Sequence, residues 1–287
     1  MEKQYEGNKP KIGLALGAGG ARGMCHLGVL KAFEEYKLDF HCISGSSMGA
    51  MMGGLYAAGV HCDEMQSMSK FATQGFVMDF NAGFNQRPGL FRLRRVTKLL
   101  TKLLGDKKIE ECGIKFCATG VDVESGELVV FDKGVLKDII RASIAIPAVF
   151  TPWEIEGRVY MDGGVLCRLP IGSLREMGAD IVIAVDALGC VRQTSAPKSI
   201  FGMIQRYYDI SDWELNRNKV IDADVLITPD LGDKSQFVFK DNETTAEAGY
   251  RSAIKAMPQI FNAINARGGN INGDTYAEAC KKAESLS

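Results

Sequence analysis

Two short apolar runs, each ending at a glycine-containing turn and each followed by a helix-forming segment, most constrain how this chain can fold. The runs at residues 11–16 and 40–44 have the composition of buried strands. Apolar residues recur with helical spacing over residues 22–36, and residues 48–58 form a second helical segment. This strand–helix–strand–helix order favours an α/β fold with a mostly parallel sheet and helices on both faces.

The same alternation continues through the rest of the 287 residues. A chain of this length suits one large α/β domain, which we place at residues 10–266. A flexible N-terminal tail is expected at residues 1–9 and a C-terminal tail or short helix at 267–287, with the last ten residues forming a polar tail. Further strands are predicted at 115–123, 128–131, 158–161, 180–185 and 220–228, and further helices at 133–143, 171–177, 200–219 and 243–263.

Charge and cysteine content exclude several classes of protein. The net charge is −1, whereas nucleic-acid-binding domains usually carry a basic excess, so no nucleic-acid partner is expected. The first ten residues lack the apolar core of a secretory signal, and the scattered cysteines suit reduced thiols, which together predict a cytoplasmic protein without a metal site. Residues 43–62 carry no charge but are rich in Gly and Ser, which favours a buried helix over a membrane span.

The segment Gly45-Ser46-Ser47-Met48-Gly49 matches G-x-S-x-G and lies between the second predicted strand and its helix. This is the context of a nucleophile elbow, a tight turn that exposes a serine hydroxyl. Gly45 and Gly49 would avoid steric clash in the turn, and the positive end of the following helix would stabilise a developing alkoxide. Ser47 is therefore a candidate nucleophile. The alternative is a glycine-rich helix start at which the serine serves only as the N-terminal cap.

A nucleophilic serine needs a base, and the three histidines are poorly placed to provide one. Only His61 follows Ser47, and fourteen residues of helix would put it about 20 Å away. His26 lies early in the first predicted helix and His41 precedes the end of the second strand. Each is expected to be a structural or surface residue, which makes a carboxylate the better candidate for the base.

Asp162 is the leading carboxylate. It follows a predicted strand in Met161-Asp162-Gly163-Gly164, where the glycines would let the backbone pass close to the serine turn. To accept the serine proton, its carboxylate would need desolvation or tight geometry. A solvated Asp-Gly turn is the alternative, and the rival carboxylates are Asp122, Asp186 and Asp209.

The segment Gly17-Ala18-Gly19-Gly20-Ala21-Arg22-Gly23 follows the first predicted strand. Such a loop gathers free backbone N–H groups that can hold a phosphate or an oxyanion. A dinucleotide-binding G-x-G-x-x-G would need glycine where Arg22 stands, and no G-K-[ST] follows, so an oxyanion hole is favoured over a nucleotide site. Arg22 is expected to brace the loop, with an ordinary surface charge as the alternative.

Four blocks, in this order, resemble those of the patatin-like phospholipase family. They are Gly19-Gly20-Ala21-Arg22-Gly23, the segment around Ser47, Arg141-Ala142-Ser143-Ile144-Ala145-Ile146-Pro147, and Met161-Asp162-Gly163-Gly164. The similarity covers about residues 10–190. Each block alone is common, whereas the four together are specific.

The resemblance implies a three-layer α/β/α sandwich and a Ser47–Asp162 dyad that works without histidine, a metal ion or a cofactor. It implies that phospholipids, lysophospholipids or other acyl esters are cleaved through an acyl-enzyme that water then hydrolyses. An acyltransferase with the same dyad and a catalytically silent lipid-binding protein remain alternatives, and the oligomeric state stays open. Under the resemblance Gly19, Gly20, Ala21 and Arg22 supply or shape the oxyanion hole, Gly45 and Gly49 belong to the elbow, and Gly163 and Gly164 form the loop after the base.

Residues 87–108 carry eight basic side chains and one acid, Asp106, with apolar residues interleaved at near-helical spacing. A basic amphipathic helix of this kind can lie on an anionic lipid surface, or it can cover an active site. The alternative is a helix of the domain with a solvated basic face. The sequence thus predicts possible peripheral contact with the inner face of a membrane.

Overall fold

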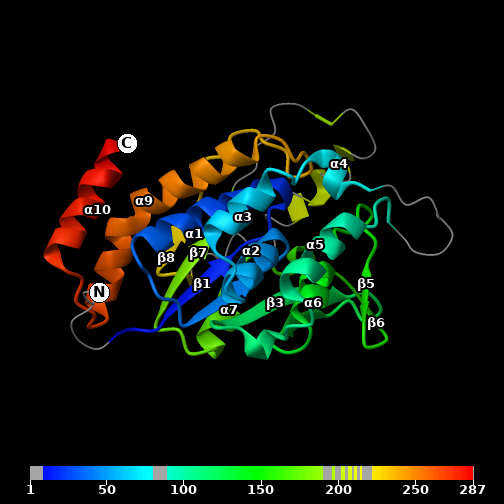
Figure 1. The fold of residues 1–287 in the computed structure, drawn as a ribbon, viewed down its shortest axis with the longest axis horizontal. Helices are drawn as coiled ribbons and strands as arrows, with labels where there is room; N and C mark the ends of the chain where they lie inside the picture. Colours follow the sequence, from blue (N-terminus) through cyan, green and yellow to red (C-terminus); the bar gives the residue numbers. More distant parts are fainter. Residues whose placement is uncertain are drawn as a thin grey trace.

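The computed structural model describes residues 9–79, 89–189 and 222–286, together with positions 196–197, 202–203, 206–208, 210–211 and 214. It has an α/β fold in which helices flank a central sheet, as expected from the alternation of strands and helices (Figure 1). The helix predicted at 200–219 and the rival carboxylate Asp209 lie largely or wholly outside the described residues.

The centre of the sheet is parallel and follows the order β3-β2-β1-β7-β8. Antiparallel strands complete one side, where β4 and β6 pair with β3 and β5 pairs with β6. The three-residue β5 was not predicted, because it is too short to show a period. The strands are β1 Ile12–Leu16, β2 Cys42–Gly45, β3 Lys115–Asp122, β4 Leu128–Phe131, β5 Trp153–Ile155, β6 Arg158–Asp162, β7 Ile181–Val185 and β8 Val225–Ile227.

Side chains alternate across the sheet, so each central strand contributes to two separate cores. In β1, Leu14 and Leu16 belong to the larger core, which also contains buried residues of α1, α2, α6 and α9. Ala15 belongs to a smaller core on the opposite face, which contains α7. Helices therefore cover both faces. They are α1 Cys25–Glu35, α2 Met48–Ala57, α6 Leu136–Ser143, α7 Ile171–Glu176 and α9 Asn242–Ala266, with the 3-10 turn η1 Gly20–Met24 leading into α1.

Of the remaining helices, α4 Gln74–Val77 and α5 Arg94–Leu104 lie at one end of the molecule, and α10 Gly273–Ser285, packed on α9, lies at the other (Figure 1). Helix α3 Cys62–Ser69 lies between these ends, next to α1. Of the tail or short helix expected at 267–287, the structure shows the helix, and the polar tail expected over the last ten residues was wrong. Helix α10 is capped by Asn272, buries Ala279 and pairs Lys282 with Glu35 of α1.

The charge-free stretch 43–62 forms β2 and the ten-residue α2, both packed in the core. Across the described ranges, none of the helices combines the length and apolar character needed to cross a bilayer.

Candidate active site

Ser47 occupies the sharp turn between β2 and α2 with a positive φ of 53° and a ψ of −122°. Only small neighbours allow this turn, since a Cβ on Gly49 would lie 2.0 Å from the Leu16 carbonyl oxygen and one on Gly45 would lie 2.5 Å from Ala50 Cα. The Ser47 side chain makes no capping hydrogen bond to α2. The local geometry is that of a nucleophile elbow, and the simple capping alternative does not describe it.

The Ser47 hydroxyl donates a hydrogen bond of 2.5 Å to Oδ2 of Asp162. The other carboxylate oxygen, Oδ1, accepts the Gly164 amide at 2.7 Å, so the aspartate also caps the short turn that follows β6. Ser47 and Asp162 are each only 4% exposed. A short bond between buried partners is stronger than one in water, because the surrounding medium screens it less.

The pairing of β3 explains why two residues 115 positions apart in the chain meet. Gly45, the last residue of β2, lies opposite Ala118, and Asp162, the last residue of β6, lies opposite Gly120. Strand β4 pairs with β3 over 118–121, a range that overlaps the pairing of β2 and the pairing of β6. Strand β4 therefore occupies one edge of β3, and β2 and β6 follow one another along the opposite edge. The two strands run in opposite directions, so their carboxyl ends face each other.

The end of α6 contacts both members of the Ser47–Asp162 pair. The Ser47 amide donates to Ser143 Oγ at 3.0 Å, and the Asp162 amide donates to the Ala145 carbonyl oxygen at 3.0 Å. Ser143 and Ala145 are fully buried. The sequence around Ser143 carries part of the resemblance to the family, but it predicts no role for Ser143 itself. The Ser143 hydroxyl accepts the amide of Ser47, which lies 96 positions earlier in the chain, and no local sequence pattern predicts such a contact.

The glycine loop between β1 and α1 lies beside the pair. The Ala21 amide donates to the Gln236 carbonyl oxygen at 2.8 Å and the Arg22 amide donates to the Gly19 carbonyl oxygen at 3.0 Å. The Gly19 and Gly20 amides donate no hydrogen bond to any of the described residues. Gly20 has a φ of +51°, and a Cβ there would lie 2.2 Å from the Gln236 carbonyl oxygen. Two backbone donors are thus left for a ligand.

Arg22 is buried, and its guanidinium braces the loop as expected, so the surface-charge alternative was wrong. Nε donates to the Ala187 carbonyl oxygen at 3.0 Å, just beyond β7. Nη1 donates to the carbonyl oxygens of Gly232 and Lys234 at 3.2 and 3.1 Å. The side chain therefore ties the glycine loop to two other segments that follow the carboxyl edge of the sheet.

His26 supports the same loop through a hydrogen bond to the backbone of Gly17. It is fully buried, and its Nε2 lies 2.7 Å from the Gly17 carbonyl oxygen. Burial lowers its pKa to about 4, so the ring is neutral at pH 7 and donates this hydrogen bond. His61 is exposed at the start of α3, and His41 is half-buried before β2. The histidines are thus structural or surface residues, as expected.

Two of the rival carboxylates have other partners. Asp186 accepts Arg168 Nη2 at 2.8 Å in a buried ion pair and also accepts the amides of Leu188 and Gly189. Asp122 accepts the amides of residues 124 and 125 in a turn, where these bonds and the nearby Arg158 lower its pKa. Of the described candidates, Asp162 is the carboxylate that bonds to Ser47.

Ser47 lies where two pockets meet. One is lined almost entirely by apolar residues of α2, α3, α4 and α5 and holds about 950 Å³ of empty space, its open mouth included. The other has a mixed lining: Asp162, Tyr207 and Tyr208 bring polar groups, whereas most of the lining is apolar and includes Ala18 and Leu188. Ser47 and Gly20 line both pockets. An extended molecule with one apolar and one polar part would place its junction at the Ser47 hydroxyl.

Helix α5 forms one wall of the apolar pocket. Its inner face carries Leu99, Leu100 and Leu103, which line the pocket, while its basic residues are exposed. The amphipathic pattern predicted over 87–108 is therefore confirmed as a helix at Arg94–Leu104, with its apolar face turned toward the pocket and not toward solvent.

Known proteins from other organisms match a little over 60% of this chain. The chain is 39% identical over 182 residues to the uncharacterized NTE family protein Mb1092c of Mycobacterium bovis, a match that covers 63% of this chain and 50% of that protein. It is 30% identical over 188 residues to the lysophospholipase nte1 of Emericella nidulans, covering 61% of this chain and 12% of that one. The chain thus spans about half the length, or much less, of these relatives.

A solved structure has a similar fold. VipD from Legionella pneumophila superposes with a TM-score of 0.51 at 12% sequence identity, covering 94% of this chain and 72% of that chain. At this identity the likeness concerns the fold alone. The model of the family described as patatin-like phospholipase matches residues 14–175, more than half of the 287 residues, and this range contains the glycine loop, Ser47, Ser143 and Asp162. The chain belongs to the patatin-like phospholipase family.

Proposed function

We propose that this protein is a lipid acyl hydrolase in which Ser47 is the nucleophile and Asp162 the base. The observation that carries the proposal is the 2.5 Å hydrogen bond from Ser47 Oγ to Asp162 Oδ2 at the junction of an apolar pocket and a pocket of mixed lining. Family membership and relatives named lysophospholipase support a lipid ester as the substrate. The proposed catalytic domain is residues 10–266.

The first half of the reaction forms an acyl-enzyme. Ser47 Oγ attacks the ester carbonyl carbon while its proton passes to Asp162 Oδ2. The carbonyl oxygen becomes an oxyanion that accepts the Gly19 and Gly20 amides, while Ala21 and Arg22 shape the loop through their own bonds. The bond to the alcohol then breaks, and Asp162 returns the proton to the departing oxygen.

The second half returns the free enzyme. A water gives a proton to Asp162 as its oxygen attacks the acyl carbon, and Ser47 leaves as the alcohol after taking that proton back. An alcohol in place of water would make the same site an acyltransferase. Product analysis with an added acceptor alcohol separates these two reactions.

The two pockets assign the two parts of the substrate. The acyl chain occupies the apolar pocket, where α5 and α2 bury it, and the alcohol part occupies the pocket beside Asp162. Burying each methylene is worth about 0.8 kcal/mol, so a long chain gains far more from this pocket than a short one. Hydrolysis of long-chain esters is therefore favoured.

The exposed basic face of α5 supports peripheral contact with an anionic membrane. Arg94, Arg95, Lys98 and Lys102 are exposed along this helix, which contains no acidic residue. Because the apolar face of α5 lines the pocket, contact would be electrostatic and would not depend on insertion of that face. A cytoplasmic location at the inner face of a membrane stays a prediction.

A fluorophosphonate probe tests the dyad. Wild type should be labelled, whereas Ser47→Ala should not be, and Asp162→Asn should be labelled at least about 1,000-fold more slowly because the base is lost. Ser46→Ala is the matched control: it removes the neighbouring buried hydroxyl, which makes no hydrogen bond to any of the described residues, and should leave labelling intact. Equal labelling of wild type and the Ser47 variant would overturn the proposal.

A further inference from the structure

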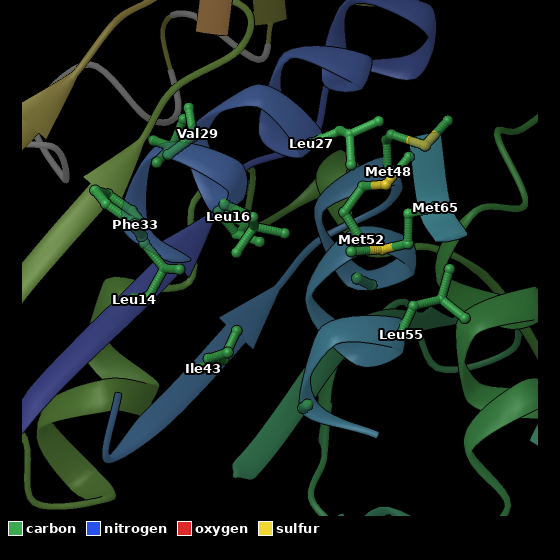
Figure 2. Packing of buried hydrophobic residues seen from close by; sticks show 14 of the residues in the cluster. Leu14, Leu16, Leu27, Val29, Phe33, Ile43, Met48, Met52, Leu55 and Met65 are labelled. Atoms are coloured by element: carbon green, nitrogen blue, oxygen red, sulfur yellow. The ribbon is translucent and has the colours of Figure 1, made fainter. Parts of the chain in front are cut away.

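Methionine is concentrated in the wall of the apolar pocket. Seven of the chain's 12 methionines line it. Met51, Met68 and Met78 are half-buried and come from α2, α3 and the segment after α4. The other four are buried, and Figure 2 shows three of them, Met48, Met52 and Met65, gathered between α2 and α3. This part of the lining is therefore rich in unbranched side chains, with Leu55 of α2 beside them.

The rest of the lining has a different composition. Branched and aromatic side chains dominate it, and they come from residues 93–103, from Ile144, Ile146 and Phe150, and from Phe76, Val77, Phe237 and Phe239. These side chains are branched or aromatic and have few low-energy rotamers. The pocket thus combines one wall of fixed shape with one wall that can change shape.

The physical difference between the two walls is rotational freedom. Methionine has three rotatable side-chain bonds and no branch, so it fills irregular gaps at little cost, and it is frequent at surfaces that bind partners of varied shape. In a wall of leucine or isoleucine, a kink or a methyl branch in the ligand would meet a fixed surface and cost about 1–3 kcal/mol per misfit. Seven methionines around one ligand would remove most of that discrimination.

We infer that this pocket accepts acyl chains of different shape and equal length with similar affinity. The inference rests on the proposed function, since it takes the ligand to be the acyl part of the substrate. Straight, cis-unsaturated and methyl-branched chains therefore form one substrate class for this protein. The pocket of mixed lining beside Asp162 then decides which esters are hydrolysed.

The test is an equilibrium measurement in the Ser47→Ala protein, which cannot turn over an ester. The bound probe is dansyl-labelled undecanoic acid, which is displaced in separate titrations by stearic acid, oleic acid and a methyl-branched stearic acid. All three acids carry the same carboxylate, so differences between their dissociation constants come from the shape of the chain. The three dissociation constants should agree within about threefold. The variant Met51→Leu/Met68→Leu/Met78→Leu changes only half-buried positions at nearly constant volume. In this variant the largest of the three dissociation constants should exceed the smallest by about tenfold or more.

The control is Met177→Leu, which exchanges a half-buried methionine in the small core on the opposite face of the sheet. This variant should leave the three constants as close together as in the parent protein. Absence of binding, a spread above about threefold in the parent, or an unchanged spread in the triple variant would each overturn the inference. No step of this test needs hydrolysis. A failure here would therefore contradict the inference about the pocket, whereas a wild type that resists the fluorophosphonate would contradict the proposed function.

Discussion

The amide of Ser47 donates a 3.0 Å hydrogen bond to Oγ of Ser143, which lies at the end of α6. The bond holds a residue whose positive φ is unusual for a side chain with a Cβ. Two residues further on, the Ala145 carbonyl oxygen accepts the amide of Asp162. The end of α6 thus sets the positions of both backbones and, through them, the distance between the two side chains.

Replacing Ser143 with alanine should impair turnover and stability together. The buried Ser47 amide would lose its acceptor, which costs about 1–3 kcal/mol of unfolding free energy, and the hydroxyl of Ser47 would lose its fixed position. We expect kcat to fall at least about tenfold with little change in KM, since substrate binding is left intact. Steady-state kinetics and urea unfolding measure the two effects.

Ser125→Ala is the control for this substitution. The Ser125 hydroxyl also accepts a backbone amide, that of Glu127, at 3.2 Å, but in an exposed turn between β3 and β4. Kinetics of this variant should match wild type. An unchanged kcat in Ser143→Ala would mean that the elbow holds its shape without this bond.

Gly20→Ala should abolish activity through crowding and not through backbone conformation alone. Its added methyl would lie 2.2 Å from the Gln236 carbonyl oxygen, which moves the loop that carries the Gly19 and Gly20 amides. Gly126→Ala is the matched variant, with a φ of +72° and no atom within 4 Å of the added methyl. Both should lose about 1–2 kcal/mol for the positive φ, and only Gly20→Ala should lose hydrolysis and fluorophosphonate labelling.

Stability should depend on pH through His26. Its pKa is lowered from 6.5 in the unfolded chain to about 4 in the folded protein, because the ring is buried. Between these values the unfolded chain binds the extra proton, so the free energy of unfolding rises as pH rises from about 4 to 6.5. The contribution is fully present above 6.5 and is lost as pH falls toward 4, with a total of about 3 kcal/mol.

Urea unfolding of His26→Gln should show a weaker pH dependence over this range. His61→Gln, which changes an exposed histidine, should keep the wild-type slope. Equal slopes in wild type and His26→Gln would show that other groups dominate the acid sensitivity.

The basic face of α5 should control binding to vesicles. Lys98→Glu/Lys102→Glu reverses two exposed charges and should reduce partition onto vesicles that contain anionic lipid at least about tenfold, because each lysine near such a surface contributes about 1 kcal/mol. The effect should shrink in 0.5 M salt, as screening shortens the reach of the charges. Co-sedimentation measures it.

The comparison variant is Lys255→Glu/Lys281→Glu on α9 and α10, at the other end of the molecule (Figure 1). It changes net charge by the same amount and should bind vesicles as wild type does. If both double variants lose binding equally, net charge and not this helix face controls contact.

Local patterns predicted most of the elements that build the site. The strand before Ser47, the helix after it and the strand ending at Asp162 all follow from apolar runs that stop at glycines. The parallel order of the central strands follows from their alternation with helices. These features depend on neighbours within a few residues, which is the range over which periodicity carries information.

Contacts between distant segments could not be predicted in this way. The amide of Ala21 belongs to the predicted oxyanion loop, yet Gln236, more than 200 residues later, takes its hydrogen bond. The role of Ser143 and the pairing of β6 beside β2 are of the same kind. The short polar helix α3 and the three-residue β5 have too little periodic signal to be recognised.

The shared edge of β3 has a consequence for how this fold can vary. Gly45 and Asp162 are paired with Ala118 and Gly120 of β3. The backbone hydrogen bonds of β3 therefore fix the distance between the turn that carries Ser47 and the end of β6 that carries Asp162. The segment between α2 and β3, which carries α3, α4 and α5, lies outside this pairing. Homologous chains are therefore free to lengthen, shorten or rebuild that segment, and with it the lining of the apolar pocket, while the spacing between Ser47 and Asp162 is kept.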